Sequence, residues 1–328
     1  MLKQTPFLKI FGLILPTFFL LTMISPCLSW AQEYPTKTIE IIVPFPPGGL
    51  GPVLAGLFAE EAKKYLPKPI IVTHKPGAAG TIGSSLAAKA APDGHTLLLA
   101  SSGPITCAPL IQKIDYSPME FEIMAQIATA PLNLAVPVGS PWKTLSDLVN
   151  EAKKNPGTVS CGNAGTYGGI HLPMIRFEKI AGIQLNHVPF KGSGDSMTAL
   201  AGGHVMSVAR FPAEGEPLVE AGKVRILTIF DSKRCKFYPN APTSKEEGHP
   251  MEAMAWRTIF APKGTPKPVL AYWNNIIKKV TEDRSFVEKA EKLKMNIEFK
   301  SAEDLKRDIQ KEIQNFSELA KELGLKPM

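Results

Sequence analysis

Residues 38–50 read TIEIIVPFPPGGL, a run of apolar and β-branched residues that passes directly into a loop of prolines and glycines. The run over 38–45 predicts a buried strand, and the cluster at 46–49 predicts a loop. Apolar residues then recur at helical spacing over 52–66. The fold therefore begins with the order strand, loop and helix.

The same order repeats along the rest of the chain. In the first part, strands are predicted at 70–73 and 96–100, loops at 76–80 and 101–104, and a helix of small residues up to 91. A second part runs from about 132 to 250, with predicted strands at 132–136, 158–161, 205–209 and 224–230, and helices at 144–154 and 171–180. This alternation predicts parallel sheets covered by helices on both faces.

The C-terminal part is predicted to be helical. An amphipathic helix covers 268–280, and Ser301-Ala302-Glu303-Asp304 resembles a capping box at the start of the last helix. Along that helix, apolar residues recur every three or four positions, at Leu305, Ile309, Ile313, Phe316, Leu319 and Leu323. We expect this stripe to pack against the first α/β unit. Lysines and acids alternate on the other positions, which is typical of a solvated face and predicts no nucleic-acid partner.

Composition and the N-terminus indicate an exported, folded protein. The chain has 328 residues, a formal net charge of +7 and 44% hydrophobic residues, which excludes wholesale disorder. Its one long apolar run, 10–24, follows two lysines and precedes Ser29-Trp30-Ala31, so residues 1–31 are predicted to be a signal peptide cleaved near Ala31. An uncleaved anchor is the alternative. Lipidation of Cys27 is disfavoured because Pro26 precedes it.

Motifs for metals, cofactors and hydrolysis do not occur in the sequence. CxxC, HxxxH and GxxxxGK[ST] are absent, and the segment 77–83 has the wrong spacing for a dinucleotide fingerprint. The segment 192–194 lacks a full GxSxG elbow, and no nucleophile and base are paired. We therefore expect no metal, no cofactor and no catalysis. Three cysteines follow the signal segment and allow at most one disulfide or three buried thiols: Cys107, Cys161 and Cys235.

Three loops follow predicted strands, at 46–51, 101–104 and 162–169. In open α/β sheets, ligands bind beyond the carboxyl ends of the strands. Glycines there let backbone N–H groups approach a ligand, and helix N-termini favour negative charge. Three such loops on two facing units predict a cleft for a small anion, most simply a carboxylate. The alternative is that they are only tight turns.

Several segments resemble the substrate-binding proteins of tripartite tricarboxylate transporters, the Bug or TctC family. The similarity extends from Tyr34 nearly to the C-terminus. The matching segments are Tyr34-Pro35 with Lys37, IEIIVPFPPGG at 39–49, KPGAAGTIG at 75–83, APDGHTLL at 91–98, HVPFKGSG at 187–194, AGGHV at 201–205, AGKVR at 221–225 and APKGTP at 261–266.

The resemblance implies a two-lobed periplasmic binding protein of type II, with mostly parallel sheets flanked by helices and joined by crossover strands. The lobes would be 32–131 plus 251–328, and 132–250. It also implies a monomeric receptor that passes a small carboxylate to a permease of one large and one small membrane subunit. The ligand-binding positions carried over are Pro47, Gly48, Gly49, Leu50, Ser101, Ser102, Gly165, Thr166, Tyr167, Gly168, Phe190, Lys191 and Gly192.

Departures from the family pattern bear on the ligand. An acid usual soon after the first Gly-Gly is replaced by Pro52, and the two aspartates of a later strand are replaced by Met206 and Arg210. A Trp-Tyr-Gly pattern reads Trp256-Arg257-Thr258. We hypothesise that Arg210, with Arg257 as a second candidate, binds another carboxylate of a di- or tricarboxylate. The alternative for each arginine is an ion pair with a local acid.

The sequence is also compatible with other ligands and other roles. Apolar side chains at Leu50, Tyr167, Phe190 and Trp256 fit a pocket for an aromatic carboxylate. An amino-acid carboxylate is a further candidate. A receptor that feeds a sensor instead of a permease has the same sequence features, and an exported hydrolase is the least supported reading.

Overall fold

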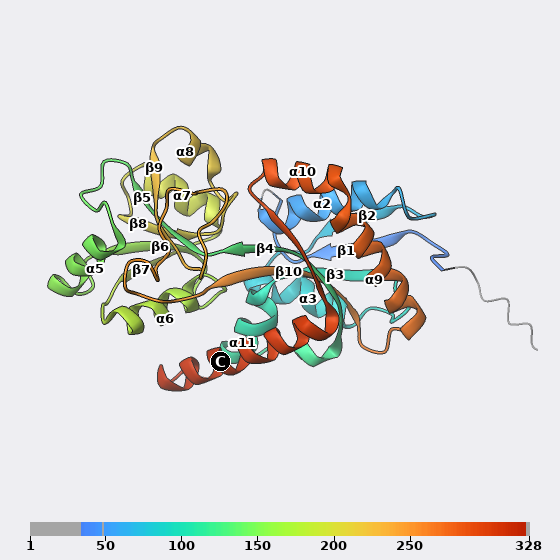
Figure 1. Ribbon diagram of the computed structural model, residues 1–328. Helices are drawn as coiled ribbons and strands as arrows, with labels where there is room; N and C mark the ends of the chain where they lie inside the picture. Colours follow the sequence, from blue (N-terminus) through green and yellow to red (C-terminus); the bar gives the residue numbers. More distant parts are fainter. Residues whose placement is uncertain (1–33, 48, 326–328) are drawn as a thin grey trace, which may run out of the picture.

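The computed structural model describes residues 34–47 and 49–325. The predicted signal peptide, 1–31, and the candidate site residue Gly48 lie outside the described residues. The described chain forms two lobes side by side, each built around one sheet (Figure 1).

The first lobe contains a six-stranded sheet in the order β11-β4-β10-β3-β1-β2. Its strands are β1 (Ile39–Val43), β2 (Ile70–His74), β3 (Thr96–Ala100), β4 (Phe121–Pro131), β10 (Met254–Pro262) and β11 (Asn296–Ser301). Its helices are α2 (Leu50–Ala62), α3 (Thr81–Ala88), α4 (Ala108–Ile111), α9 (Lys267–Glu282), α10 (Arg284–Lys292) and α11 (Ala302–Glu322). Short turns of helix lie at η1 (Ala78–Gly80), η2 (Gly103–Cys107) and η3 (Pro118–Glu120).

The second lobe contains a five-stranded sheet in the order β7-β6-β8-β5-β9. Its strands are β5 (Asn133–Pro137), β6 (Ser160–Ala164), β7 (Asn186–Phe190), β8 (Ser207–Arg210) and β9 (Val224–Ile229). Its helices are α5 (Leu145–Lys154), α6 (His171–Ala181), α7 (Ser193–Ala201) and α8 (Glu216–Glu220).

Both sheets are mixed. Strand β1 pairs in parallel with β2 and β3, and β6 pairs in parallel with β7 and β8, as the alternating pattern predicts. Strand β10 is antiparallel to both β3 and β4, β11 is antiparallel to β4, and β5 is antiparallel to β8 and β9. The reason is the chain path: β4 leads into the second lobe and β10 leads back, so the two must run in opposite directions.

Some elements have no clear sequence signal. Strand β4 is rich in alanine, and the edge strand β11 is half-exposed and polar, so neither shows a β-branched apolar run. The C-terminal part is predicted to be helical, which agrees with α9, α10 and α11 but not with β11. Helix α7, of nine residues, is not predicted either.

The core on both faces of β1 explains why its sequence is continuously apolar. Ile39, Ile41 and Val43 pack with α2 residues in the largest hydrophobic cluster, which extends into the second lobe. Ile42 packs on the opposite face with residues of β3, β10 and α11. A strand buried on both faces is typical of the parallel part of an α/β sheet.

Helix α11 begins where the capping pattern predicts. The Asp304 N–H donates to Ser301 Oγ at 3.3 Å. The stripe along α11 packs on the first lobe at Leu305 and Ile309, as expected. Farther along, Phe316 and Leu319 form a cluster with Leu172 of the second lobe, so α11 contacts both lobes (Figure 1). The stripe therefore packs against the first lobe as expected and, toward its C-terminal end, against the second lobe as well.

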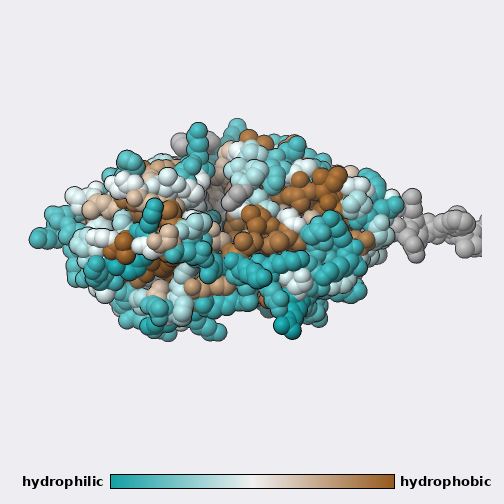
Figure 2. Space-filling view, turned by 90° about the horizontal axis from the view of Figure 1, so that it is seen from above, coloured by the Kyte–Doolittle hydropathy of each residue, from teal (hydrophilic) through white to brown (hydrophobic). Residues whose placement is uncertain are grey.

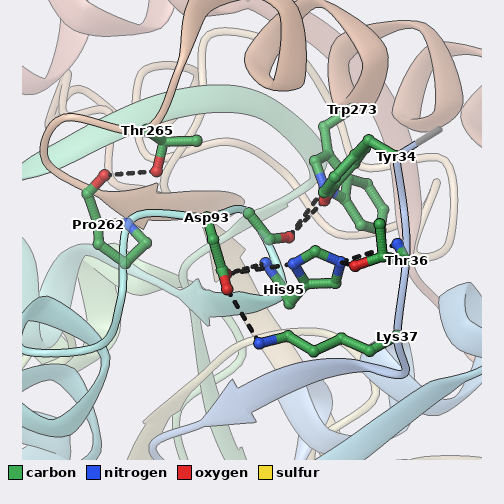
Figure 3. A network of polar contacts seen from close by, with 9 residues as sticks. Tyr34, Thr36, Lys37, Asp93, His95, Pro262, Thr265 and Trp273 are labelled. Carbon is green, nitrogen blue, oxygen red and sulfur yellow. Dashed lines mark hydrogen bonds and ion pairs between the residues drawn. The ribbon is translucent and has the colours of Figure 1, made fainter. Parts of the chain in front are cut away.

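A polar network joins two of the segments that carry the family resemblance (Figure 3). The Tyr34 hydroxyl donates to the Gly94 carbonyl, which also accepts from Trp273 Nε1 at 3.2 Å. The Thr36 N–H donates to His95 Nε2 at 3.1 Å, and the Lys37 ammonium pairs with Asp93 at 3.0 Å. Residues 34–37 are thereby held against the loop that precedes β3.

The outer surface shows few features that indicate a function. Seen from above, it is largely hydrophilic, with separate hydrophobic areas on both lobes (Figure 2). Within residues 34–47 and 49–325, no helix has the length and apolarity needed to cross a membrane.

The network in Figure 3 predicts a large cost for a methyl group at Gly94. This residue has φ +79°, and an added Cβ would contact Val269 and lie 2.7 Å from the Tyr34 hydroxyl oxygen. We expect Gly94→Ala to lower the free energy of unfolding by at least about 2 kcal/mol in urea denaturation.

Gly56→Ala is the matched control for that substitution. Gly56 is exposed in the middle of α2, and an added Cβ would meet nothing within 4 Å. We expect it to gain about 0.5–1 kcal/mol. Equal stability of Gly94→Ala and the wild type would contradict the steric argument.

Candidate ligand-binding site

Loops from the two lobes meet at the carboxyl ends of β3 and β6. A Cβ added at Gly169 would lie 3.1 Å from Ser102 Oγ and 3.4 Å from the Gly103 nitrogen. Ser101 and Ser102 are both buried at this junction. The structure thus brings the predicted serines of the first lobe against the glycine-rich loop of the second lobe.

The loop after β1 presents the N-terminus of α2. Gly49 is the extended N-cap residue, no side chain caps the helix, and no acid lies in its first turn. The first backbone hydrogen bond of the helix runs from the Val53 N–H to the Gly49 carbonyl at 3.2 Å. The N–H groups at the start of the helix, before this first bond, have no acceptor within the helix. They therefore concentrate a partial positive charge that favours an anion. Leu50 is buried in the main hydrophobic cluster, whereas Pro47 is exposed.

The glycine-rich loop of the second lobe is shorter than predicted. Gly162 belongs to β6, together with Asn163 and Ala164. A Cβ at Gly162 would lie 3.0 Å from Val208 and 3.2 Å from Phe190, so this glycine is needed for packing inside the lobe. The predicted loop 162–169 is corrected to 165–169.

Within that loop, the backbone is held by a histidine. Gly165 and Tyr167 have φ angles of +87° and +53°. The Tyr167 N–H donates to His171 Nδ1 at 2.7 Å, and the His171 ring packs against His187 at a centroid distance of 4.3 Å. Burial and the neighbouring His187 lower the pKa of His171 to about 4, so it stays neutral and accepts this hydrogen bond at neutral pH.

The remaining candidates of the second lobe lie at the end of β7, at the start of α7 or within the loop 165–169 itself. Phe190 packs in the second lobe's own hydrophobic cluster. Lys191 is exposed, and Gly192 is the N-cap of α7. Thr166 is exposed, and Gly168 is buried beside it. Among the described residues, no hydrogen bond joins 190–192 to the first lobe.

Arg210 forms its hydrogen bonds with groups of its own lobe. Its side chain is fully buried, and Nη2 donates to Glu216 Oε2 at 3.1 Å and to the Tyr238 hydroxyl at 3.1 Å. Nε donates to the Phe211 carbonyl at 3.1 Å. This is the local ion pair that formed the alternative to a ligand contact.

Arg257, in contrast, is a buried cation without a carboxylate partner among the described residues. It is 8% exposed, its Nη1 donates only to the Trp256 carbonyl at 3.1 Å, and its buried Nε has no hydrogen-bond partner. A Cβ at Gly51 would lie 3.8 Å from that Nε, and the guanidinium carbon is 5.9 Å from the centre of the Phe211 ring. Burial lowers the pKa of Arg257.

A cavity of about 350 Å³ extends from this junction toward α11. Ser102, Gly169 and Phe211 line one end. The other part carries charges of both signs, with acids at Glu252, Glu298, Asp308 and Glu312 and bases at Arg176, Lys300 and Lys311.

Glu312 is a half-buried acid that the sequence analysis did not single out. Its Oε2 accepts from Trp256 Nε1 at 2.7 Å, and burial raises its pKa to about 7. The sequence feature that could have identified Glu312 is its position three residues after Ile309, on the side of α11 that carries the apolar stripe. A carboxyl at such a position must be hydrogen-bonded or protonated.

Cysteine and metal chemistry contribute little to the described part of the chain. Cys107, Cys161 and Cys235 are buried free thiols. In residues 34–47 and 49–325, no three His, Cys, Asp or Glu side chains are grouped so as to hold a metal ion.

Comparisons with known proteins agree with this architecture. The model of the tripartite tricarboxylate transporter family receptor matches residues 54–325. A UPF0065 protein in the gbd 5′ region of Cupriavidus necator is 32% identical over 301 residues, which cover 92% of this chain and 91% of that protein. Among solved structures, R. palustris Rpa4515 with adipate is 28% identical, has a TM-score of 0.83, and is matched over 90% of this chain and 100% of its own. MatC from Rhodopseudomonas palustris with bound malate is 28% identical, with a TM-score of 0.79 and coverage of 87% and 99%.

The raised pKa of Glu312 predicts a pH dependence of stability. The carboxyl holds its proton more tightly in the folded protein than in the unfolded chain, where the ordinary pKa is 4.5. Its contribution to the free energy of unfolding therefore falls as pH rises from about 4.5 to about 7, by up to about 3 kcal/mol, and is constant above that range. We expect Glu312→Gln to be more stable than the wild type at pH 8 and equally stable at pH 4.

Urea denaturation across that pH range measures the difference. Glu318→Gln, which alters an exposed acid on the same helix, serves as the control and should give a profile parallel to that of the wild type. A constant difference between Glu312→Gln and the wild type from pH 4 to pH 8 would show that Glu312 does not titrate in this window.

Proposed function

The chain belongs to the family of tripartite tricarboxylate transporter receptors, and from this we propose that it is a periplasmic solute receptor that captures a small carboxylate between its lobes. Two structurally similar relatives hold adipate and malate, which are dicarboxylates. We further propose that residues 1–31 are removed on export. The mature protein would then act as a monomer and deliver its ligand to a permease with a large and a small membrane subunit.

The observation that carries this proposal is the junction of the three loops. Ser102 and the loop 165–169 meet from opposite lobes, and β1, which leads to the uncapped N-terminus of α2, runs parallel to β3, which leads to the buried Ser101 and Ser102. Backbone N–H groups and hydroxyls are the donors that bind a carboxylate without a metal or cofactor. We assign the ligand carboxylate to Gly49, Leu50, Ser101, Ser102 and the 165–168 backbone.

The contacts of the aromatic residues favour an aliphatic ligand over an aromatic one. Trp256 points toward α11, where it donates to Glu312. Phe190 packs in the second lobe's cluster, and the Tyr167 ring lies against His171 with a centroid distance of 5.1 Å. Phe190 and Tyr167 are thus engaged by side chains of the second lobe, which supports an aliphatic ligand.

Thermal shift with pairs of dicarboxylates and their neutral diamides tests the function. Ligand at about 100 times its Kd adds about 2.7 kcal/mol of stability. We expect adipate, malate or a related dicarboxylate to raise the melting temperature and adipamide or malamide to have no effect. Equal stabilisation by the diamides, or none by any carboxylate, would refute a carboxylate receptor.

A variant at the loop junction tests the site. Gly169→Val should weaken binding of the stabilising carboxylate at least tenfold, because its side chain would push the 165–169 loop away from Ser102. Gly139→Val is the control, since an added Cβ at this exposed turn meets nothing within 4 Å. Isothermal titration calorimetry measures both, and unchanged affinity of Gly169→Val would remove this junction from the binding site.

A further inference from the structure

We propose that Arg257 is the specificity-determining residue of the cleft, where its guanidinium binds a second acidic group of the ligand and restricts tight binding to dianions. This inference rests on the proposed function and adds a subsite to it. The loop junction would hold one carboxylate, and Arg257 would require the other.

The first observation is a buried charge that has no ion-pair partner among the described residues. Arg257 is more than nine-tenths buried, and no carboxylate of the described chain lies within ion-pair distance of it. Burying an isolated charge costs several kcal/mol unless a partner and hydrogen bonds offset it. The guanidinium has five N–H donors, and within the described part of the chain the backbone carbonyl of Trp256 is the one acceptor bonded to them. An incoming carboxylate would supply the missing partner in bidentate geometry.

The second observation is that no group around Arg257 binds it as an ion pair. The charge of Glu214 acts on Arg257 and favours its charged form, but no ion pair within 4.0 Å joins the two described side chains, and the Oε2 of Glu214 accepts from the Phe211 N–H at 3.0 Å. Gly51, in the first turn of α2, lies on the other side and adds the positive end of a helix that has no acid in that turn. Phe211 presents a ring face that accommodates the guanidinium without changing its charge.

The third observation concerns the backbone. Strand β10 shifts register against β4 between Arg257 and Thr258. Such irregularities re-aim side chains and are frequent beside binding sites. Phe211, which contacts Arg257, also lines the 350 Å³ cavity together with Ser102 and Gly169. The cavity thus extends from the loop junction to the immediate neighbour of Arg257.

The comparison with Arg210 separates the two arginines. Arg210 is fully buried, but Glu216 and Tyr238 accept its donors. Its charge is matched inside the second lobe, which gives it a structural role. Arg257 has no equivalent of Glu216, so the requirement for a second acidic group is assigned to Arg257 alone.

Calorimetry with matched ligand pairs tests this assignment. Adipate and hexanoate share a chain length, as do succinate and butyrate, and malate differs from 3-hydroxybutyrate by one carboxylate. We expect the wild type to bind at least one dicarboxylate at least tenfold more tightly than its monocarboxylate partner. Arg257→Gln should lose that preference, and Arg257→Lys should keep only part of it, because the ammonium retains the charge without the planar fork.

Arg284→Gln is the control, since Arg284 is exposed on α10 and pairs only with Glu288. It removes the same charge and should keep the wild-type preference. In addition, ligand-free Arg257→Gln should melt no lower than the wild type, because it removes an unpaired buried charge. A purely structural Arg257 would give a lower melting temperature and an unchanged preference, which overturns the inference.

The outcomes distinguish the inference from the proposed function. Carboxylates that bind the wild type with no preference for dianions refute the role of Arg257 and leave the receptor function intact. Failure of every mono- and dicarboxylate to bind the wild type refutes the receptor function, and the inference with it.

Discussion

The cleft depends on the antiparallel pair of strands β4 and β10. The pair extends from Phe121 opposite Pro262 to Pro131 opposite Met254 and carries the chain from one lobe to the other and back. Because successive strand residues point to opposite faces, Trp256 faces α11 while Arg257 faces the first turn of α2. One pair of crossover strands therefore joins the lobes and carries Trp256, bound to Glu312, on one face and Arg257, which has no ion-pair partner among the described residues, on the other.

The lobes are joined by the crossover strands, by α11 and by the largest hydrophobic cluster, which extends across both lobes. Ion pairs also join Lys179 to Glu322, Lys236 to Glu291, and Lys294 to Glu220 across the lobes. All three include exposed side chains, and such pairs contribute about 0–1 kcal/mol each. These three pairs therefore add little to the relative position that the crossover strands and the shared apolar contacts set.

The sequence predicts best where periodicity and burial coincide. Strands β1 and β3 lie within one or two residues of the predicted runs, and α11 begins at the predicted cap, because these segments are apolar on the faces they bury. Strand β4 was missed because its alanine-rich sequence becomes a strand only between two partners, β10 and β11. Gly162 was placed in a ligand loop because glycine content alone does not distinguish a flexible turn from close packing of a helix on a strand.

The sequence alone also does not distinguish Arg210 from Arg257, because both are substitutions in the family pattern. Their difference is tertiary: Glu216 and Tyr238 fold back onto Arg210, while the acid near Arg257 is bound to a backbone N–H. A buried cation without an ion-pair partner lowers the stability of the ligand-free state, and such losses concentrate at functional sites. In the role proposed for Arg257, the ligand supplies the anion that the described residues do not. A receptor is the kind of protein for which this arrangement is useful, because the ligand that neutralises the charge is also the one that favours closure of the lobes.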